Sequence, residues 1–166
     1  MVAVQKLHLF LEAQLLGYDW RIIIADNGST DATPKIGFGL SESYRRVDYL
    51  YLTKRGRGRA LKRTWLESAT EIVAYMDVDL STDLDALPPA VEAVARQGYD
   101  IAVGSRLLEG AAVVGRGLKR EIISRCYSLL FRVLFFVKFK DAQCGFKVVS
   151  RRVVRSVVPL VQNNGW

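Results

Sequence analysis

The sequence predicts an α/β fold, with a doubly wound, mostly parallel sheet flanked by helices. Short apolar runs recur at residues 20–25, 49–53, 72–76 and 100–103, and such runs are typical of strands buried in a parallel sheet. Segments with helical spacing or helix start signals separate these runs, which is the order of elements expected for this fold. With 166 residues the chain has the length of one domain, so we expect a single domain over residues 1–166.

The composition excludes a disordered chain, because 50% of the residues are hydrophobic and 25% are charged. The net charge of +7 points to an anionic partner: a nucleotide, a lipid phosphate, a membrane surface or a nucleic acid. Cys126 and Cys144 follow neither a zinc spacing nor a disulfide framework, as expected for a reduced cytosolic protein. The sequence shows no signal peptide and no uninterrupted apolar run of membrane-spanning length.

The first half of the chain begins with a predicted helix over residues 7–16, which Gly17 would end, and the strand at 20–25 follows. The next residues, DNGSTD at 26–31, are turn and cap formers, so one interpretation is a simple strand-to-helix loop. The functional alternative is a nucleoside site, in which Asp26 and Asp31 accept hydrogen bonds and Gly28 lets the backbone come close.

The strand at 49–53 leads into KRGRGRA at residues 54–60, where glycines alternate with cations at the start of a predicted helix. Backbone amides and guanidinium groups converge at such a place, which favours phosphate binding. A nucleic-acid contact would suit the same pattern.

The segment IVAYMDVDLSTD, residues 72–83, places two carboxylates just after a strand predicted to be buried on both faces. If the strand geometry persists, Asp77 and Asp79 point to the same side, at the sheet edge where α/β proteins bind ligands. Two hard oxygen donors there can hold a divalent cation, and through it a diphosphate. The alternative is that both acids cap the next helix.

That next helix is predicted from Asp83 or Asp85 through Ala95, with Gly98 ending it. The strand at 100–103 then delivers Arg106 to the same sheet edge as the aspartates. A later strand before Ser150 and a helix capped by that serine complete the predicted elements.

The predicted helix at 118–137 is apolar around most of its circumference, and lysines and arginines flank it. Such a helix is either buried or in contact with lipid. Burial against a part of the protein that is missing from this chain and an interfacial membrane location remain open alternatives.

Five segments stand in a fixed order: ADNGSTDAT, KRGRGRAL, YMDVDLS, VGSRLL with LKREIIS, and DAQCGFK. As an ordered set they resemble the family 2 glycosyltransferases of GT-A (Rossmann-like) fold, and among them the enzymes that transfer a hexose to dolichyl or another polyprenyl phosphate. The resemblance runs from about Gly17 to Trp166.

The resemblance implies roles for the residues of these motifs. Asp26, Gly28 and Asp31 would lie around the nucleoside, and Arg57 and Gly58 would line the donor site. Asp77 and Asp79 would form the DXD motif for Mg²⁺ or Mn²⁺, with Asp79 the more direct ligand. The remaining positions would bind the acceptor phosphate or donor diphosphate and the transferred sugar: Arg106, Arg120 and Ser124 for the phosphates, and Gln143 for the sugar.

The implied activity is transfer of a hexose from a nucleotide sugar to a polyprenyl phosphate, with inversion, and DAQCGFK favours UDP-glucose. The implied location is the cytoplasmic face of a membrane, peripheral or anchored through segments outside this chain. Two alternatives stay open: a non-lipid acceptor, or an inactive remnant that binds anions or membranes. We expect no specific nucleic-acid partner, since no aromatic stacking pattern is present, while an oligomer is possible.

The chain also departs from the family pattern. Relatives begin with a strand carrying a Pro-x-Tyr-Asn-Glu-like segment, and they continue beyond a tryptophan that matches Trp166. We therefore expect a fragment that lacks the first strand and the C-terminal segment. Position 81 is a serine where some mannose synthases have glutamine.

Overall fold

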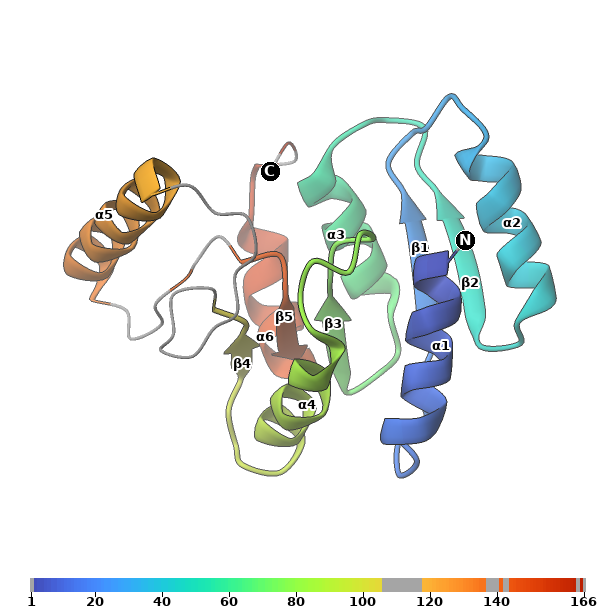
Figure 1. Cartoon of the computed structure of the whole chain (residues 1–166), viewed down its shortest axis with the longest axis horizontal. Helices are drawn as coiled ribbons and strands as arrows, with labels where there is room; N and C mark the ends of the chain where they lie inside the picture. Colours follow the sequence, from blue (N-terminus) through green and yellow to red (C-terminus); the bar gives the residue numbers. More distant parts are fainter. Residues whose placement is uncertain (1, 106–117, 137–140, 142–143, 164, 166) are drawn as a thin grey trace.

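The computed structural model describes residues 2–105, 118–136, 141, 144–163 and 165 (Figure 1). Its strands are β1 (Ile22–Asp26), β2 (Val47–Tyr51), β3 (Ile72–Tyr75), β4 (Ile101–Val103) and β5 (Lys147–Ser150). Its helices are α1 (Val2–Gln14), α2 (Thr33–Ser43), α3 (Arg57–Glu67), α4 (Leu87–Ala95), α5 (Leu118–Phe135) and α6 (Arg151–Val157), with short 3₁₀ turns η1 (Leu84–Ala86) and η2 (Val158–Leu160).

The strands form two sheets. β1 and β2 are parallel, in register from Ile22 opposite Val47 to Asp26 opposite Tyr51. In the second sheet β5 lies between β3 and β4 and is antiparallel to both, so β3 and β4 run in the same direction. The predicted α/β class is confirmed. The direction of β5 is the exception to a parallel sheet, because an apolar run alone does not encode the direction of its neighbours.

The local start signals work as the sequence predicts. The Asp83 side chain accepts a hydrogen bond from the backbone N–H of Asp85 (3.1 Å) at the start of η1, and Ser150 accepts one from Val153 (3.4 Å) at the start of α6. The predicted helix through Ala95 is divided into η1 and α4. Gly98 follows α4 with a φ of 78°, which suits glycine at a helix end.

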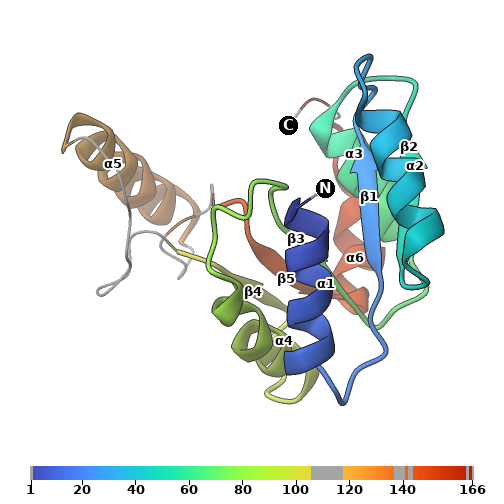
Figure 2. The same ribbon diagram turned by 45° about the vertical axis from the view of Figure 1, so that its right-hand side comes forward.

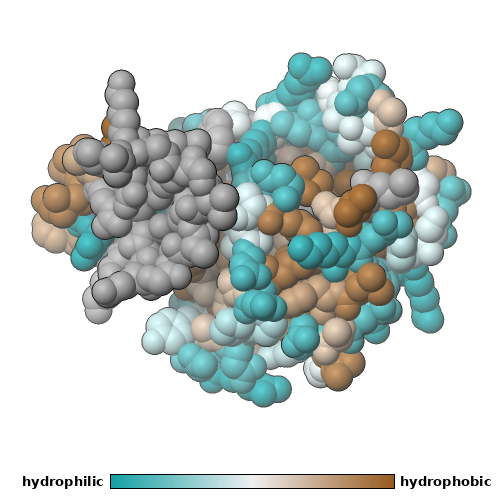
Figure 3. Space-filling model, viewed as in Figure 1, coloured by the Kyte–Doolittle hydropathy of each residue, from teal (hydrophilic) through white to brown (hydrophobic). Residues whose placement is uncertain are grey.

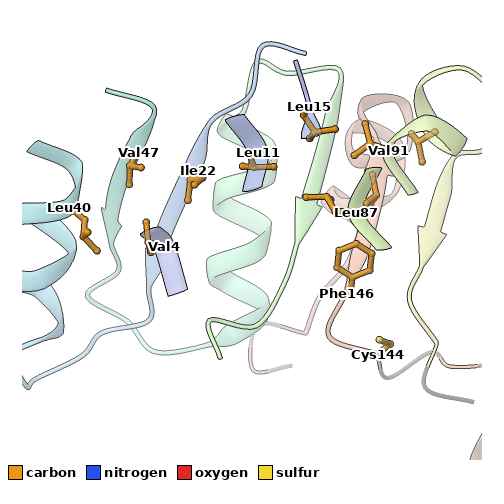
Figure 4. Packing of buried hydrophobic residues seen from close by; sticks show 12 residues of the cluster. Val4, Leu11, Leu15, Ile22, Leu40, Val47, Leu87, Val91, Cys144 and Phe146 are labelled. Atoms are coloured by element: carbon orange, nitrogen blue, oxygen red, sulfur yellow. The ribbon is translucent and has the colours of Figure 1, made fainter. Parts of the chain in front are cut away.

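The main hydrophobic core joins the two sheets through α1 and α4 (Figure 4). Leu11 and Leu15 pack in one cluster with Ile22 of β1 and with Phe146 and Val148 at β5. Fully burying a side chain of this size contributes about 1.5–3 kcal/mol. This core fixes the relative positions of the strand ends that carry the candidate site.

β3 is less buried than the sequence predicts. Val73 is buried, but Ala74 is exposed and the other two residues are half-buried. In the residues described here, β3 is hydrogen-bonded along one edge, to β5, which leaves part of the strand uncovered.

Helix α5 stands apart from the two sheets in both Figure 1 and Figure 2. Of its side chains that the structure describes, none is buried, and hydrophobic ones are exposed along its length: Ile123, Tyr127, Leu129, Leu130, Val133 and Leu134. Hydrophobic surface is visible at this end of the molecule in Figure 3. Among the described helices, none is both long and apolar enough to cross a membrane.

Candidate functional site

The candidate site lies where β1, β2 and β3 end, because the loop that follows each strand leaves from the same side of the molecule (Figure 1). These loops carry the motifs DNGSTD, KRGRGR and DVD. The carboxyl ends of parallel strands are the usual ligand-binding edge of an α/β sheet. The arrangement therefore brings together three motifs that are far apart in the sequence.

The loops after β1 and β2 are tied together by hydrogen bonds. The Asn27 side-chain oxygen accepts from the backbone N–H of Gly56 (2.7 Å), and the Gly28 carbonyl accepts from Arg55 Nε (3.3 Å). Gly28 has a φ of 72°, and a Cβ there would lie 3.1 Å from the Leu52 carbonyl oxygen. The glycine thus allows both a left-handed backbone and the close approach of the second loop.

Asp26, the last residue of β1, is 4% exposed. Its Oδ1 accepts a hydrogen bond from the Ser29 backbone N–H (2.9 Å), and its Oδ2 accepts one from the Tyr49 hydroxyl (2.7 Å). Burial would raise the pKa of the Asp26 carboxyl, but these hydrogen bonds outweigh burial and hold the pKa below its ordinary value. Asp26 is therefore an ionised carboxylate inside the loop.

Asp31 occupies a different environment, since it is exposed. Its Oδ1 accepts a hydrogen bond from the Thr33 backbone N–H (2.9 Å), and hydrogen bonding by the Thr33 side chain and backbone lowers the pKa of the Asp31 carboxyl. Asp31 thus lies one residue before the N-cap of α2, Ala32, and its side chain binds the first residue of the helix, on the same loop as Asp26.

Arg57, the first residue of α3, links the second motif to the third. One of its terminal guanidinium nitrogens donates to both the Tyr75 hydroxyl and Asp77 Oδ1. The Tyr75 hydroxyl also donates to Asp77 Oδ1 (2.6 Å), and the guanidinium carbon lies 5.3 Å from the centre of the Tyr75 ring. Gly58 follows in the first turn of α3 and is half-buried. The helix start and the DXD segment therefore share one charged cluster.

The two aspartates of the DXD segment lie on a turn, because β3 ends at Tyr75. The Leu80 backbone N–H donates to the Asp77 carbonyl (3.0 Å), and Leu80 has a φ of 50°. Asp79 is exposed, and its Oδ1 accepts from the Ser81 backbone N–H (3.0 Å). The strand geometry therefore does not persist through both aspartates, and a turn sets their orientation.

The donor set of this turn fits a hard divalent ion. Mg²⁺ is commonly held by one or two carboxylates together with waters and substrate phosphates, and Asp77 and Asp79 offer two carboxylates of this kind. In the part of the chain that the structure describes, no group of three or more His, Cys, Asp or Glu residues forms a complete protein cage. The Asp77 carboxylate already faces a cation, the Arg57 guanidinium.

Sequence reasoning missed several residues at this site. Gly145 packs so closely on Asp77 that a Cβ would overlap the carboxylate. Lys147 lies opposite Tyr75 in the β3–β5 register, and its Nζ donates to the Cys144 carbonyl (2.5 Å). Burial lowers the pKa of Lys147, while the nearby carboxylates oppose that shift. The sequence signal was the motif DAQCGFK itself, but only the pairing of β5 with β3 shows where its residues lie.

The structure describes no side-chain contacts for the other predicted site residues. Arg106 and Gln143 lie outside the described residues. Arg120 and Ser124 belong to α5, of which the structure gives the backbone at these two positions. Their implied phosphate and sugar contacts stay predictions.

An α/β domain with a cation-rich helix start beside paired carboxylates has the arrangement that many proteins use to bind phosphorylated ligands. More specifically, the chain belongs to glycosyl transferase family 2, whose family model matches residues 4–158.

Similar proteins include glycosyltransferase AglD of Haloferax volcanii, 35% identical over 99% of this chain and 26% of that protein. Dolichyl-phosphate beta-glucosyltransferase of Drosophila melanogaster is 30% identical over 95% of this chain and 52% of its own length. Dolichol-phosphate mannosyltransferase of Pyrococcus furiosus is 29% identical over 93% of this chain and 44% of its own length. The chain thus spans between about a quarter and a half of these relatives.

Proposed function

We propose that this chain binds a nucleotide sugar and forms the catalytic domain of an enzyme that transfers the hexose to a polyprenyl phosphate. Family membership supports a glycosyl transfer. The names of similar proteins support a lipid-phosphate acceptor, since they include dolichyl-phosphate glucosyltransferases and a dolichol-phosphate mannosyltransferase. Several of them are glucosyltransferases and one is a mannosyltransferase, and DAQCGFK favours glucose, so we propose UDP-glucose as the donor.

The contact between Arg57 and Asp77 is the observation on which the donor site rests. It puts the first turn of α3, with its backbone amides and arginines, beside the carboxylates of the DXD turn. A diphosphate bound there would meet positive charge from one side and a metal held by Asp77 and Asp79 from the other. Mg²⁺ or Mn²⁺ would supply the positive charge that stabilises the leaving nucleoside diphosphate.

The acceptor phosphate is largely a dianion near neutral pH, so it needs no strong general base. The protein's part is to bring two anions together and to hold them in line. We assign this part to Arg106, Arg120 and Ser124, with Gln143 beside the sugar. An attack from the face opposite the nucleotide would invert an α-linked donor to a β-linked product, in agreement with the beta-glucosyltransferase names.

The exposed apolar side chains of α5 favour a lipid acceptor over a soluble one. Leu130 and Leu134 are 58% and 61% exposed, one turn apart on the same face. Exposed apolar side chains on a helix with basic residues at its ends are typical of a helix in the membrane interface. We therefore propose that α5 contacts the membrane surface from which the polyprenyl phosphate is taken, and that the domain is peripheral there.

Calorimetry tests the donor site. UDP, UDP-glucose, GDP and GDP-mannose would be titrated into the chain with and without Mn²⁺, beside the Asp79→Asn variant. We expect Mn²⁺-dependent binding of the uridine nucleotides and its loss in Asp79→Asn. Asp19→Asn is the matched control, since Asp19 is highly exposed and precedes β1. A folded chain that binds none of the four nucleotides would refute the proposal.

Vesicle co-sedimentation tests the membrane contact. The double variant Leu130→Ser/Leu134→Ser is expected to lose binding to anionic phospholipid vesicles. Leu9→Ser/Leu16→Ser removes two exposed leucines elsewhere and should keep it. Equal binding by both variants would rule out α5 as the membrane contact and leave a non-lipid acceptor as the better hypothesis.

A further inference from the structure

The Asp26 carboxylate is held by the protein at both of its oxygens. Ser29 occupies Oδ1 through its backbone N–H, and Tyr49 occupies Oδ2 through its hydroxyl. A buried carboxylate without such partners would be strongly unfavourable, and hydrogen bonds to an ionised acceptor are among the stronger ones. A carboxylate has about four acceptor positions, so each oxygen keeps one for a further donor.

Tyr49 is itself fixed by three elements. It belongs to β2 and pairs with Ile24 of β1. Its ring lies against Gly37 of α2, so closely that a Cβ at position 37 would overlap the ring. Burial, followed by the bond to Asp26, raises the pKa of Tyr49 to about 12, so the hydroxyl remains a donor at neutral pH.

The position of Asp26 determines where the two donor loops meet. Its carbonyl accepts a hydrogen bond from the Leu52 N–H (2.9 Å), and the next residue, Asn27, accepts from Gly56 immediately before Arg57. A shift of Asp26 would therefore move both the loop that starts at Asp26 and the loop that leads into α3.

We propose that Tyr49 is a positioning residue of the nucleoside site: its ring packs against Gly37, and its hydroxyl fixes the Asp26 carboxylate in the orientation that receives the nucleoside. This inference rests on the proposed nucleotide-sugar function. Tyr49 acts through Asp26 and need not touch the ligand. Contacts thus run continuously from α2 to the site. Gly37 packs against the Tyr49 ring, Tyr49 and Ser29 hold the Asp26 carboxylate, and hydrogen bonds join the loop after Asp26 to the loop before α3.

The test compares Tyr49→Phe with Tyr18→Phe. Both variants remove one tyrosine hydroxyl that donates to a carboxylate, because Tyr18 donates to Glu92 (3.0 Å). They differ in position, because Tyr18 lies before the start of β1, whereas the site residue Asp26 lies at its end. UDP would be titrated with Mn²⁺ into the parent chain and both variants. We expect about tenfold weaker binding for Tyr49→Phe, as for other lost hydrogen bonds to charged groups, and an unchanged affinity for Tyr18→Phe.

A carboxyl ¹³C titration of Asp26, which needs no nucleotide, gives the second readout. Tyr49→Phe should raise the pKa of Asp26, and Tyr18→Phe should leave the titration unchanged. Equal UDP affinity in Tyr49→Phe and the parent would overturn the inference alone. A parent chain that binds no UDP would overturn the proposed function and the nucleoside role of Tyr49 with it, while the titration would still report whether Tyr49 holds Asp26.

Discussion

Gly145 lies directly against the carboxylate of Asp77, although the two residues come from motifs far apart in the sequence. A Cβ at position 145 would overlap Asp77 Oδ2. The same carboxylate accepts hydrogen bonds from Arg57 and Tyr75 through Oδ1. The glycine of DAQCGFK therefore closes one side of the DXD carboxylate, and the first turn of α3 closes the other.

Gly145→Ala is expected to displace Asp77, because neither the backbone just before β5 nor the carboxylate can withdraw without breaking its contacts. We expect a loss of stability of about 1–3 kcal/mol, as for other overpacked sites, and weaker Mn²⁺-dependent UDP binding. Denaturant unfolding and calorimetry measure the two effects. Gly17→Ala is the control, since a Cβ at Gly17 meets nothing within 4 Å. Parent-like UDP binding by Gly145→Ala would show that Asp77 tolerates the extra methyl group.

Arg57→Gln should change metal and nucleotide binding in opposite directions. Arg57 places a positive charge at Asp77 Oδ1, where the Tyr75 hydroxyl also donates, so its removal takes away a competing cation and should raise the affinity for Mn²⁺ alone. The same change removes a guanidinium from the proposed diphosphate site and should weaken UDP binding about tenfold. Electron paramagnetic resonance of free Mn²⁺ and calorimetry with UDP measure these affinities.

Arg63→Gln is the control for that experiment, because Arg63 also lies on α3 but pairs with Glu67 in the same helix (3.0 Å). It should leave both affinities unchanged. Weaker Mn²⁺ binding in Arg57→Gln would mean that Arg57 supports the metal site instead of competing with it.

Much of the site's frame could be predicted from sequence because its signals are local. Apolar runs marked the strands, Ser150 and Asp83 marked element starts, and the glycines and cations before α3 marked a possible phosphate site. Strand alternation was a weaker guide, since Asp77 and Asp79 lie on a turn that begins as soon as β3 ends.

The contacts that join the motifs could not be predicted in this way, because they depend on pairing between distant segments. Gly145 reaches Asp77 only because β5 lies antiparallel beside β3. Tyr49 looks like an ordinary core residue of a strand, and its hydroxyl bond to Asp26 follows from the β1–β2 register together with the glycine in α2. The hydrophobic periodicity and the strand propensity of a segment carry no information about such partners.

Two glycines of α2 should respond oppositely to alanine. A methyl group added at Gly39 would meet nothing within 4 Å, so Gly39→Ala should stabilise the protein by roughly 0.5–1 kcal/mol through reduced backbone entropy. Gly37→Ala gains the same entropy but drives the methyl group into the Tyr49 ring, and overpacking of about 1–3 kcal/mol should outweigh the gain. Denaturant unfolding of both variants measures the difference. Stabilisation by both would show that Tyr49 is free to move.

The stability of the protein should fall in acid, below about pH 4, where unperturbed carboxyl groups titrate. Asp26 and Asp100 both have a lowered pKa in the folded chain. For Asp100 the causes are its hydrogen bonds from Arg152 Nε (3.1 Å) and Ser150 Oγ (2.9 Å). A carboxyl whose folded pKa lies below its unfolded value stabilises the fold above the unfolded pKa, and this stabilisation is lost as the pH falls through the folded pKa.

Asp100→Asn should therefore reduce the loss of unfolding free energy between neutral and acidic pH, measured by urea titrations at several pH values. Asp19→Asn, at a highly exposed position, should keep the parent's acid dependence. An acid dependence of Asp100→Asn equal to that of the parent would show that the bonds to Arg152 and Ser150 do not favour the ionised carboxylate.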